Sequence, residues 1–216
     1  MSSTRSSDMS QTRRAGPRDI PGVVAVHQAG FQGFFLTQLG PAFLRQYYAA
    51  VLDHPGGILG VVQEESGEVT GFVAGFLDPP EFYRLLRSRR VRLGLAVLPA
   101  LLRSPGRLRR VLGNMRRTGD AARAPDDARL DCELASITVS PSHARRGYGG
   151  DLVRFLLAEA AARGARRVHL TTDAQGNEKV NRFYAELDFT LDGTVQHGDR
   201  LMNRYVRDLA LAEPVS

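Results

Sequence analysis

One short turn in the sequence has the composition that binding a phosphate group requires. The stretch "VSPSHARRGYGGDL", residues 139–152, ends an apolar run and leads into a long segment with helical periodicity. The first N–H groups of a helix have no intrahelical partner and lie at the positive end of its dipole. Glycines leave the backbone uncovered there, and neighbouring arginines add positive charge. The stretch therefore predicts a phosphate or diphosphate site made by Arg145, Arg146, Gly147, Tyr148, Gly149 and Gly150.

Two common phosphate-binding patterns do not match this turn. The dinucleotide pattern G-x-G-x-x-G needs a third glycine, but Leu152 stands at that position after Gly147 and Gly149. A P-loop needs Gly-Lys-Ser/Thr, and the single lysine, Lys179, lies elsewhere. We therefore expect neither a dinucleotide fold nor a P-loop.

A second motif, "NEKVNRFYAELDF" from Asn177 to Phe189, lies downstream. Together the two stretches resemble the GNAT superfamily of acetyl-CoA-dependent N-acetyltransferases. Its signatures are a strand ending V-x-P before Q/R-x-x-G-x-G/A at a helix start, and N-x-x-(small)-x-x-F-Y-x-x-x-G-F. The sequence departs from them at Ala144, where the family usually has Gln or Arg, and at Asp188, where it has glycine. Because Asp adopts a left-handed turn more readily than most residues, we expect Asp188 to replace that glycine.

The resemblance implies how the coenzyme binds. In the family, the diphosphate of coenzyme A lies on the backbone amides of the glycine turn, and the pantetheine arm pairs with the end of the preceding strand. An asparagine before the second helix reaches the same arm, and a backbone N–H near Val139 receives the acetyl carbonyl. Besides the turn, the resemblance therefore assigns coenzyme binding to Ile137, Thr138, Val139 and Asn177, with acetyl-CoA as co-substrate and no metal.

Two side chains are the catalytic candidates. Tyr184, in the Phe-Tyr pair of the second motif, matches the family's usual acid, and a phenol can protonate a thiolate of similar basicity. We expect Glu133 to be the base. It lies eleven residues before Ala144, as the catalytic glutamate does in the histone-acetylating branch, which shares the run "RGYG". On a regular strand Glu133 would share a face with Ala135 and Ile137, and an apolar site would raise its pKa.

Each candidate also has a purely structural interpretation. Tyr184 lies on an apolar helical stripe, where tyrosines are usually core residues with a hydrogen-bonded hydroxyl. Glu133 also fits an ordinary ion-paired carboxylate, and many enzymes of the family use a chain of waters in place of a nearby base. The arginine pair beside the glycines also fits a solvated surface. The base therefore stays open between Glu133 and a water chain.

Periodicity and turn signals predict the elements that position these residues. Helices are expected from Asp19, as its cap, and within Gly40–Gly57, followed by a β-hairpin that turns at residues 65–67. After an arginine-rich helical insertion, interrupted by Pro99 and Pro105-Gly106, come strand, helix, strand, helix and two final strands. This order predicts a mixed α/β (α+β) protein. The resemblance implies the GNAT acyltransferase fold: a central mixed β-sheet flanked by helices, with the insertion between the third and fourth strands.

The same signals give the domain boundaries. We expect one acetyltransferase domain, because the chain is long enough for one good core and shows no internal repeat. The expected segments are a disordered basic tail over 1–18, the acetyltransferase domain over 19–210 with its insertion over 79–127, and a C-terminal tail over 211–216.

The composition limits the class of protein. The 216 residues carry a net charge of +6, almost wholly from arginine, which favours anionic ligands or partners. Cys132 is the single cysteine, so no internal disulfide is expected, and the five histidines show no metal-site spacing. The sequence shows neither an apolar run of the roughly 20 residues that span a bilayer nor an apolar signal segment, so we expect a cytoplasmic protein.

The sequence says least about the acetyl acceptor. Arginine forks in the insertion suit phosphate groups, so an amino sugar, a nucleotide-linked amino sugar or another small-molecule amine is expected. The alternatives are a protein N-terminus or lysine and, in another class, a catalytically inactive GNAT-like protein that binds nucleic acid. Phe82 and Tyr83 are the only aromatic residues of the insertion, which disfavours nucleic acid. A homodimer and a transient contact of the insertion with a membrane surface stay open.

Overall fold

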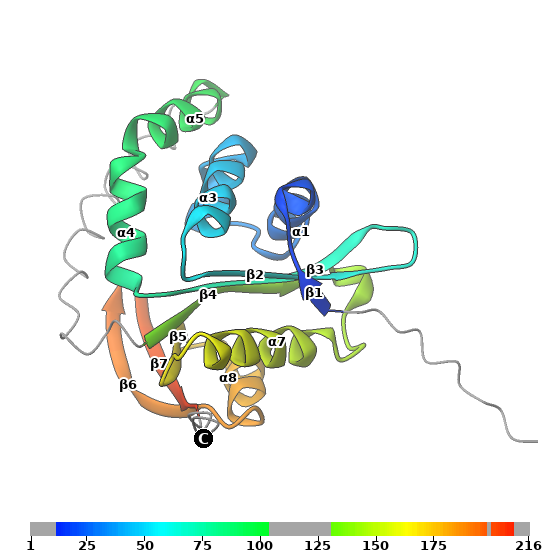
Figure 1. The fold of residues 1–216 in the computed structure, drawn as a ribbon, viewed down its shortest axis with the longest axis vertical. Helices are drawn as coiled ribbons and strands as arrows, with labels where there is room; N and C mark the ends of the chain where they lie inside the picture. The colour runs from blue at the N-terminus through cyan, green and yellow to red at the C-terminus, as the bar shows by residue number, and fades with distance from the viewer. Residues whose placement is uncertain (1–11, 104–130, 198–199, 210–216) are drawn as a thin grey trace, which may run out of the picture.

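The computed structural model describes residues 12–103, 131–197 and 200–209, which form one β-sheet between two layers of helices (Figure 1). The strands are β1 (Thr12–Arg14), β2 (Gly57–Gln63), β3 (Val69–Leu77), β4 (Asp131–Val139), β5 (Arg167–Asp173), β6 (Thr190–His197) and β7 (Arg200–Asp208). The helices are α1 (Ile20–Gly30), α2 (Phe35–Gln38), α3 (Pro41–Asp53), α4 (Pro79–Ser88), α5 (Arg90–Arg103), α7 (Tyr148–Ala162) and α8 (Glu178–Ala185). In the sheet order β1-β2-β3-β4-β5-β7-β6, α1, α3 and α4 lie on one side of the sheet and α7 and α8 on the other.

The central strand β3 is buried on both faces. Its sequence "VTGFVAGFL" is almost continuously apolar, as expected of a strand with a helix layer on each side. Phe72 packs with α1 and α3, whereas Val73 packs with α7. Two glycines of the strand leave room for α7, because a Cβ at Gly75 would lie only 2.7 Å from Leu156 Cδ1. The small residues of β3 therefore bring α7 close beneath the sheet.

The partners of β4 differ on its two sides. It pairs antiparallel with β3 over residues 132–139, but parallel with β5 only where residues 131–133 face residues 167–169. Beyond Glu133 and His169, the last pair, the two strands diverge. Within the described part of the chain, the β4 backbone groups that face this opening have no strand partner, so they are available to a ligand.

A β-bulge lies where the divergence begins. Ala74 of β3 faces Ser136 while Gly75 faces Leu134, so Ala135 is an extra residue in β4. An extra residue bends its strand and increases the local twist. The bulge therefore provides a local cause for the separation of β4 from β5.

The sheet starts earlier than the sequence indicates. β1 pairs antiparallel with β2, with Thr12 opposite Val62. Residues 12–18 therefore belong to the fold, although the sequence places them in a disordered tail; the tails over 1–11 and 211–216 lie outside the described residues. An ion pair between Arg13 and Asp19, 2.7 Å from Nη2 to Oδ1, fastens this segment. The Asp19 carboxylate is thus used by Arg13, and α1 has no side-chain cap, contrary to the sequence expectation.

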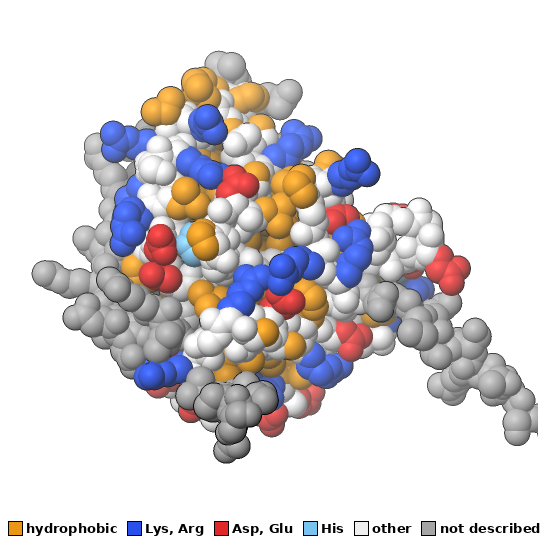
Figure 2. All heavy atoms as spheres, viewed as in Figure 1, with side chains coloured by type: hydrophobic (Ala, Val, Ile, Leu, Met, Phe, Trp, Pro, Cys, Tyr) orange, Lys and Arg blue, Asp and Glu red, His pale blue; other side chains and the backbone are white. Residues whose placement is uncertain are grey.

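The insertion lies between β3 and β4, as predicted, and its described part is the two helices α4 and α5. The predicted break at Pro99 is wrong, because α5 continues through it. Proline removes one backbone bond, but Leu95, whose carbonyl loses its partner, is exposed, so water can satisfy that group. Figure 2 shows apolar and basic side chains interspersed over this part of the surface. Pro105-Gly106 and the rest of the insertion lie outside the described residues.

Most other elements agree with the sequence. The predicted hairpin is β2 and β3, and the strand–helix–strand–helix order is β4, α7, β5 and α8. Asp188 adopts the expected left-handed turn, with φ of 59°. The mixed fold with a central sheet flanked by helices is therefore confirmed. None of the described helices is long and apolar enough to cross a bilayer.

Candidate active site

The turn for which we predict phosphate binding lies at the start of α7. Gly147, just before the helix, has φ of 87°, and Arg145 has φ of 66°, so both are left-handed. No described side chain caps the helix, and its first backbone bond runs from the Asp151 N–H to the Gly147 carbonyl at 3.2 Å. The amides of residues 148–150 therefore lack an intrahelical acceptor, and the positive end of the helix dipole favours an anion there.

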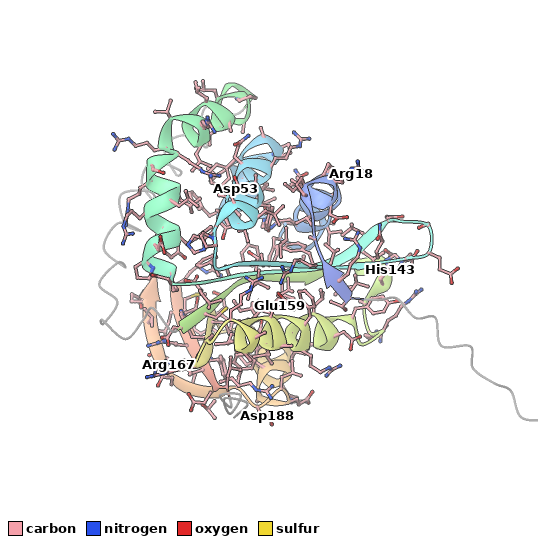
Figure 3. All side chains as sticks on the ribbon, viewed as in Figure 1. Arg18, Asp53, His143, Glu159, Arg167 and Asp188 are labelled. Carbon is pink, nitrogen blue, oxygen red and sulfur yellow. The ribbon has the colours of Figure 1, made fainter. Side chains whose placement is uncertain are left out.

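One arginine of this turn already has an acidic neighbour. Arg146 Nη1 lies 3.6 Å from Glu64 Oε1, and His143 Nε2 lies 2.8 Å from the same oxygen. Figure 3 labels His143 beside the loop that joins β2 and β3. Glu64 therefore links this loop to the turn, and a bound diphosphate would compete with it for Arg146.

Ile137, Thr138 and Val139 lie where β4 has left β5. They pair with β3 on one side, so the other edge of their backbone faces the opening. The side chains of Ile137 and Val139 pack against the core around α7, whereas Thr138 points to the other face, toward Gly30. The backbone of this segment is therefore placed as the predicted pairing with an extended ligand requires.

Asn177 stands on the other side of the opening, at the start of α8. Its Nδ2 donates a hydrogen bond to Oγ1 of Thr172, in the diverging half of β5. This bond holds the Asn177 side chain beside the opening, and the side chain does not cap α8. The structure thus brings the predicted coenzyme residues of β4 and α8 to two sides of one opening.

Tyr184, on α8, is buried, with only 5% of its surface exposed. Its ring contacts Phe183, Phe189 and Tyr205, with centroids 5.2, 5.6 and 6.2 Å away. Its hydroxyl makes no hydrogen bond with another described residue. Burial raises the pKa of Tyr184 above its ordinary value, so the phenol holds its proton at neutral pH.

Glu133 is the last residue of β4 that pairs with β5, and its side chain is half-buried. Loss of water around the carboxylate raises its pKa to about 7, and a hydrogen bond from the Tyr83 hydroxyl to Oε1, at 2.9 Å, opposes that rise. A carboxylate with a pKa near the working pH can both take and return a proton. The environment of Glu133 therefore suits the predicted base.

The acid and base candidates lie on opposite faces of the sheet. Tyr184 belongs to the core around α7 and α8, whereas Glu133 contacts Tyr83 of α4 on the other face. The expectation that Glu133 shares a face with Ile137 is wrong, because the bulge at Ala135 reverses the alternation of β4. An amine could approach from the side of Glu133 while a thiolate leaves on the side of Tyr184.

Three residues near the opening were missed by the sequence analysis. Tyr83 binds Glu133 from the insertion, which lies far from both motifs in sequence. Tyr48 of α3 is fully buried, and His27 Nδ1 of α1 lies 2.6 Å from its hydroxyl. No local pattern in the sequence indicates that Tyr48 and His27, 21 residues apart, lie in contact.

A cavity of about 1000 Å³ lies away from this opening, beside α1 and the β2–β3 hairpin. Its lining includes Arg13 together with Asp19 and Gln63, to which Arg13 donates hydrogen bonds, and contains none of the predicted site residues. Elsewhere, the described residues contain no group of His, Cys, Asp and Glu suited to a metal ion. Cys132 is buried, and desolvation raises the pKa of its thiol to about 12, so it is a poor nucleophile.

Comparisons with known proteins identify a family match over part of the chain. The model of the acetyltransferase (GNAT) family matches residues 118–189, which include β4, the glycine turn, α7, β5 and α8. The search of curated proteins found no match.

Three solved structures show the same fold at low sequence identity. They are a ribosomal-protein-alanine N-acetyltransferase from Brucella melitensis (16% identity, TM-score 0.62, 92% of this chain and 99% of that chain), an N-acetyltransferase from Staphylococcus aureus Mu50 (16%, 0.57, 92% and 97%), and Chaetomium thermophilum Naa20 in complex with a bisubstrate analogue (18%, 0.54, 92% and 86%). Residues 118–189 therefore match the GNAT acetyltransferase family, and the described chain shares the fold of these three structures.

Proposed function

We propose that this chain transfers the acetyl group of acetyl-CoA to a primary amine by direct attack of the amine on the thioester. The divergence of β4 from β5 is the main observation that supports this proposal. It begins at Glu133, whose pKa is about 7, and extends along β4 toward the turn whose amides lack intrahelical partners. A base, an open strand edge and an anion site in this order suit a long acyl-coenzyme.

The residues of the opening fit acetyl-CoA, which supplies an acetyl group activated as a thioester. The amides of 148–150 would hold the diphosphate, with Gly149 and Gly150 leaving the backbone uncovered and Arg145 and Arg146 adding charge. The exposed backbone edge of residues 137–139 would pair with the amides of the pantetheine arm, and Asn177 would contact the arm from the other side.

The two catalytic candidates have complementary protonation states. Glu133 is partly ionised near pH 7 and would accept the proton of the amine. Tyr184 is protonated and would donate to the departing sulfur from the opposite face. Glu133 would meet the amine nitrogen on one face of the sheet, and Tyr184 would meet the departing sulfur on the other.

A small-molecule amine is the acceptor class that we propose, with amino sugars and nucleotide-linked amino sugars as the first candidates. The segment before α2 reaches β7: the Arg200 guanidinium carbon lies 5.4 Å from the centroid of the Phe34 ring. Arg200 Nε also donates to Asp173 Oδ1 at the end of β5, at 2.8 Å. These contacts tie the segment before α2 to the ends of β5 and β7, and from them we infer a slender acceptor in preference to the folded surface of a protein.

An amine panel tests the reaction and the acceptor class together. Amino sugars, nucleotide-linked amino sugars, and peptides with free N-termini or lysines would each be given acetyl-CoA, with detection of free thiol and mass spectrometry of the product. We expect N-acetylation of a small amine. Acetylation of peptides alone would contradict the acceptor class, and no acetylated amine from any class would contradict the proposed reaction.

The pH dependence tests the role of Glu133. A base must be ionised to act, so kcat/KM should fall about tenfold per pH unit below a pKa of about 7. Glu133→Gln should lower kcat/KM by about 10²- to 10⁴-fold at pH 8 and remove this acidic limb. An unchanged acidic limb in the variant would show that a group other than Glu133 titrates, and the water chain would then be the route for the amine proton.

A further inference from the structure

The insertion helix α4 places one side chain directly against the proposed base. The Tyr83 hydroxyl donates to Glu133 Oε1 at 2.9 Å, and no other described residue donates a hydrogen bond to this carboxylate. We propose that Tyr83 is a positioning residue for Glu133: its hydroxyl fixes Oε1 and leaves Oε2 to receive the proton of the acceptor amine. This inference rests on the proposed function, in which Glu133 is the base.

Aromatic packing fixes the ring of Tyr83 beside β4. Its neighbour Phe82 is fully buried and stacks on Phe76, with ring centroids 3.8 Å apart and planes at 18°. Phe76 faces Glu133 across the β3–β4 pair, and the Tyr83 ring contacts the Phe76 ring edge-on at 5.7 Å. The hydroxyl therefore reaches Glu133 from a ring with a defined orientation, even though 39% of the Tyr83 surface is exposed.

Both ends of α4 are fastened to the rest of the fold. At its start, Asp78 Oδ1 accepts from the Glu81 N–H at 3.1 Å, and the Asp78 N–H donates to the Asp131 carbonyl at 3.2 Å. At its end, Arg89 Nη1 lies 2.9 Å from Asp53 Oδ2 of α3, which Figure 3 labels. A helix held at both ends can place a hydroxyl repeatedly at the same point, which a positioning residue requires.

The titratable neighbours of Glu133 named below do not change charge near neutral pH, whereas Glu133 does. Burial and then the charge of Glu133 raise the pKa of Tyr83 from α4 and of Tyr47 from α3, so both phenols stay protonated. His169, its partner on β5, has its pKa lowered by burial and then by Arg204 of β7, so it is neutral there. Burial raises the pKa of the adjacent Cys132 thiol to about 12.

Tyr83→Phe tests the inference, because it removes the hydroxyl and keeps the ring. Without this donor the ionised carboxylate loses a stabilising bond, so the acidic limb of kcat/KM should move up by about one pH unit. The rate at pH 6 should then fall about tenfold more than the rate at pH 9, while the Kd for acetyl-CoA stays unchanged. Tyr47→Phe is the matched control, since it removes a neighbouring phenol that makes no hydrogen bond with a described residue, and it should leave the limb in place.

A direct titration separates this inference from the proposed function. In protein labelled with carbon-13 glutamate, with Glu133 assigned by loss of its signal in Glu133→Gln, the carboxylate pKa should rise in Tyr83→Phe together with the kinetic limb. If neither moves while Glu133→Gln is inactive, the positioning role of Tyr83 is wrong and the base assignment stands. If the carboxylate pKa rises but the kinetic limb does not, Glu133 is not the base, and the proposed mechanism fails together with the inference.

Discussion

At the scale of single residues, Tyr184 and Glu133 differ in what surrounds their oxygen atoms. Tyr184 lies among aromatic rings, and burial raises its pKa, so it keeps its proton. Glu133 is half-buried at the edge of the opening, where its pKa of about 7 leaves it partly ionised. Environments that separate two pKa values in this way allow one group to donate a proton while the other accepts one.

Tyr184→Phe should lower kcat by about 10²- to 10⁴-fold, the usual contribution of a general acid, because the variant keeps the packing and loses the proton. The Kd for acetyl-CoA, measured by calorimetry, should stay unchanged. Tyr205→Phe removes a hydroxyl from the same aromatic cluster and should retain the rate. Equal rates for Tyr184→Phe and the wild type would remove Tyr184 from the mechanism.

At the scale of elements, the start of α7 combines a helix dipole with an uncovered backbone. Its position is set by Leu152 and Leu156, which pack fully buried against β3. Gly149 does not need glycine for conformational reasons, because its φ is not positive and a Cβ there would lie 3.5 Å from Phe183, an ordinary contact. The fold would therefore tolerate a larger residue at position 149, and we expect the absence of a side chain there to leave room for the proposed diphosphate.

Gly149→Glu should weaken acetyl-CoA binding at least about 100-fold, because it places a negative charge beside the proposed diphosphate site. The comparison variant is Gly94→Glu on α5, where a Cβ would meet nothing within 4 Å. Calorimetry should show wild-type affinity for this comparison variant. Tight binding of acetyl-CoA by a folded Gly149→Glu protein would show that the turn is misassigned.

Local chemistry explains which elements could be predicted from the sequence. Glycine turns, helix starts and the hairpin depend on neighbouring residues, so the turn before α7, the left-handed Asp188 and the β2–β3 turn were accessible. The bulge at Ala135 depends on how β4 pairs with β3, and the bond from Tyr83 to Glu133 joins segments 50 residues apart. Such contacts follow from tertiary packing, and no local pattern encodes them.

The early start of the sheet has a similar cause. The segment before α1 looks polar and basic, which is typical of a tail. In the structure, Arg13 pairs with Asp19 and Gln63, and this pairing lets β1 join the edge of the sheet beside β2. A charged side chain therefore favours order here because it bonds both to nearby Asp19 and to Gln63, which lies on a strand distant in sequence.

At the scale of the whole molecule, buried titratable groups make stability depend on pH with opposite signs. Burial lowers the pKa of His27 to about 4. The contribution of its neutral ring to the free energy of unfolding is therefore present above pH 6.5 and is lost as the pH falls toward 4. Glu133 has a folded pKa of about 7, above its ordinary value of 4.5. Its contribution is therefore fully present below pH 4.5 and is lost as the pH rises through 7.

Glu133→Gln should therefore stabilise the protein at pH 8 while it impairs activity. The neutral amide avoids the cost of an ionised carboxylate in this site, so Tm should rise by roughly 2–4 °C, the change that about 1 kcal/mol gives a chain of this size. At pH 4.5 the difference in Tm between the variant and the wild type should nearly vanish, because Glu133 is then protonated in the folded wild type. Protonation of His27 affects both proteins equally, so it does not change this difference. Thermal unfolding at the two pH values checks this, and an equal gain at both would contradict the assigned pKa shift.

A structure of the complex with coenzyme A tests whether the turn before α7 holds the diphosphate. We expect the diphosphate within hydrogen-bond distance of the amides of residues 148–150, with the pantetheine arm between β4 and β5 and its sulfur between Glu133 and Tyr184. Coenzyme A bound elsewhere, for example in the cavity beside α1, with the turn before α7 empty, would contradict the proposed site and mechanism.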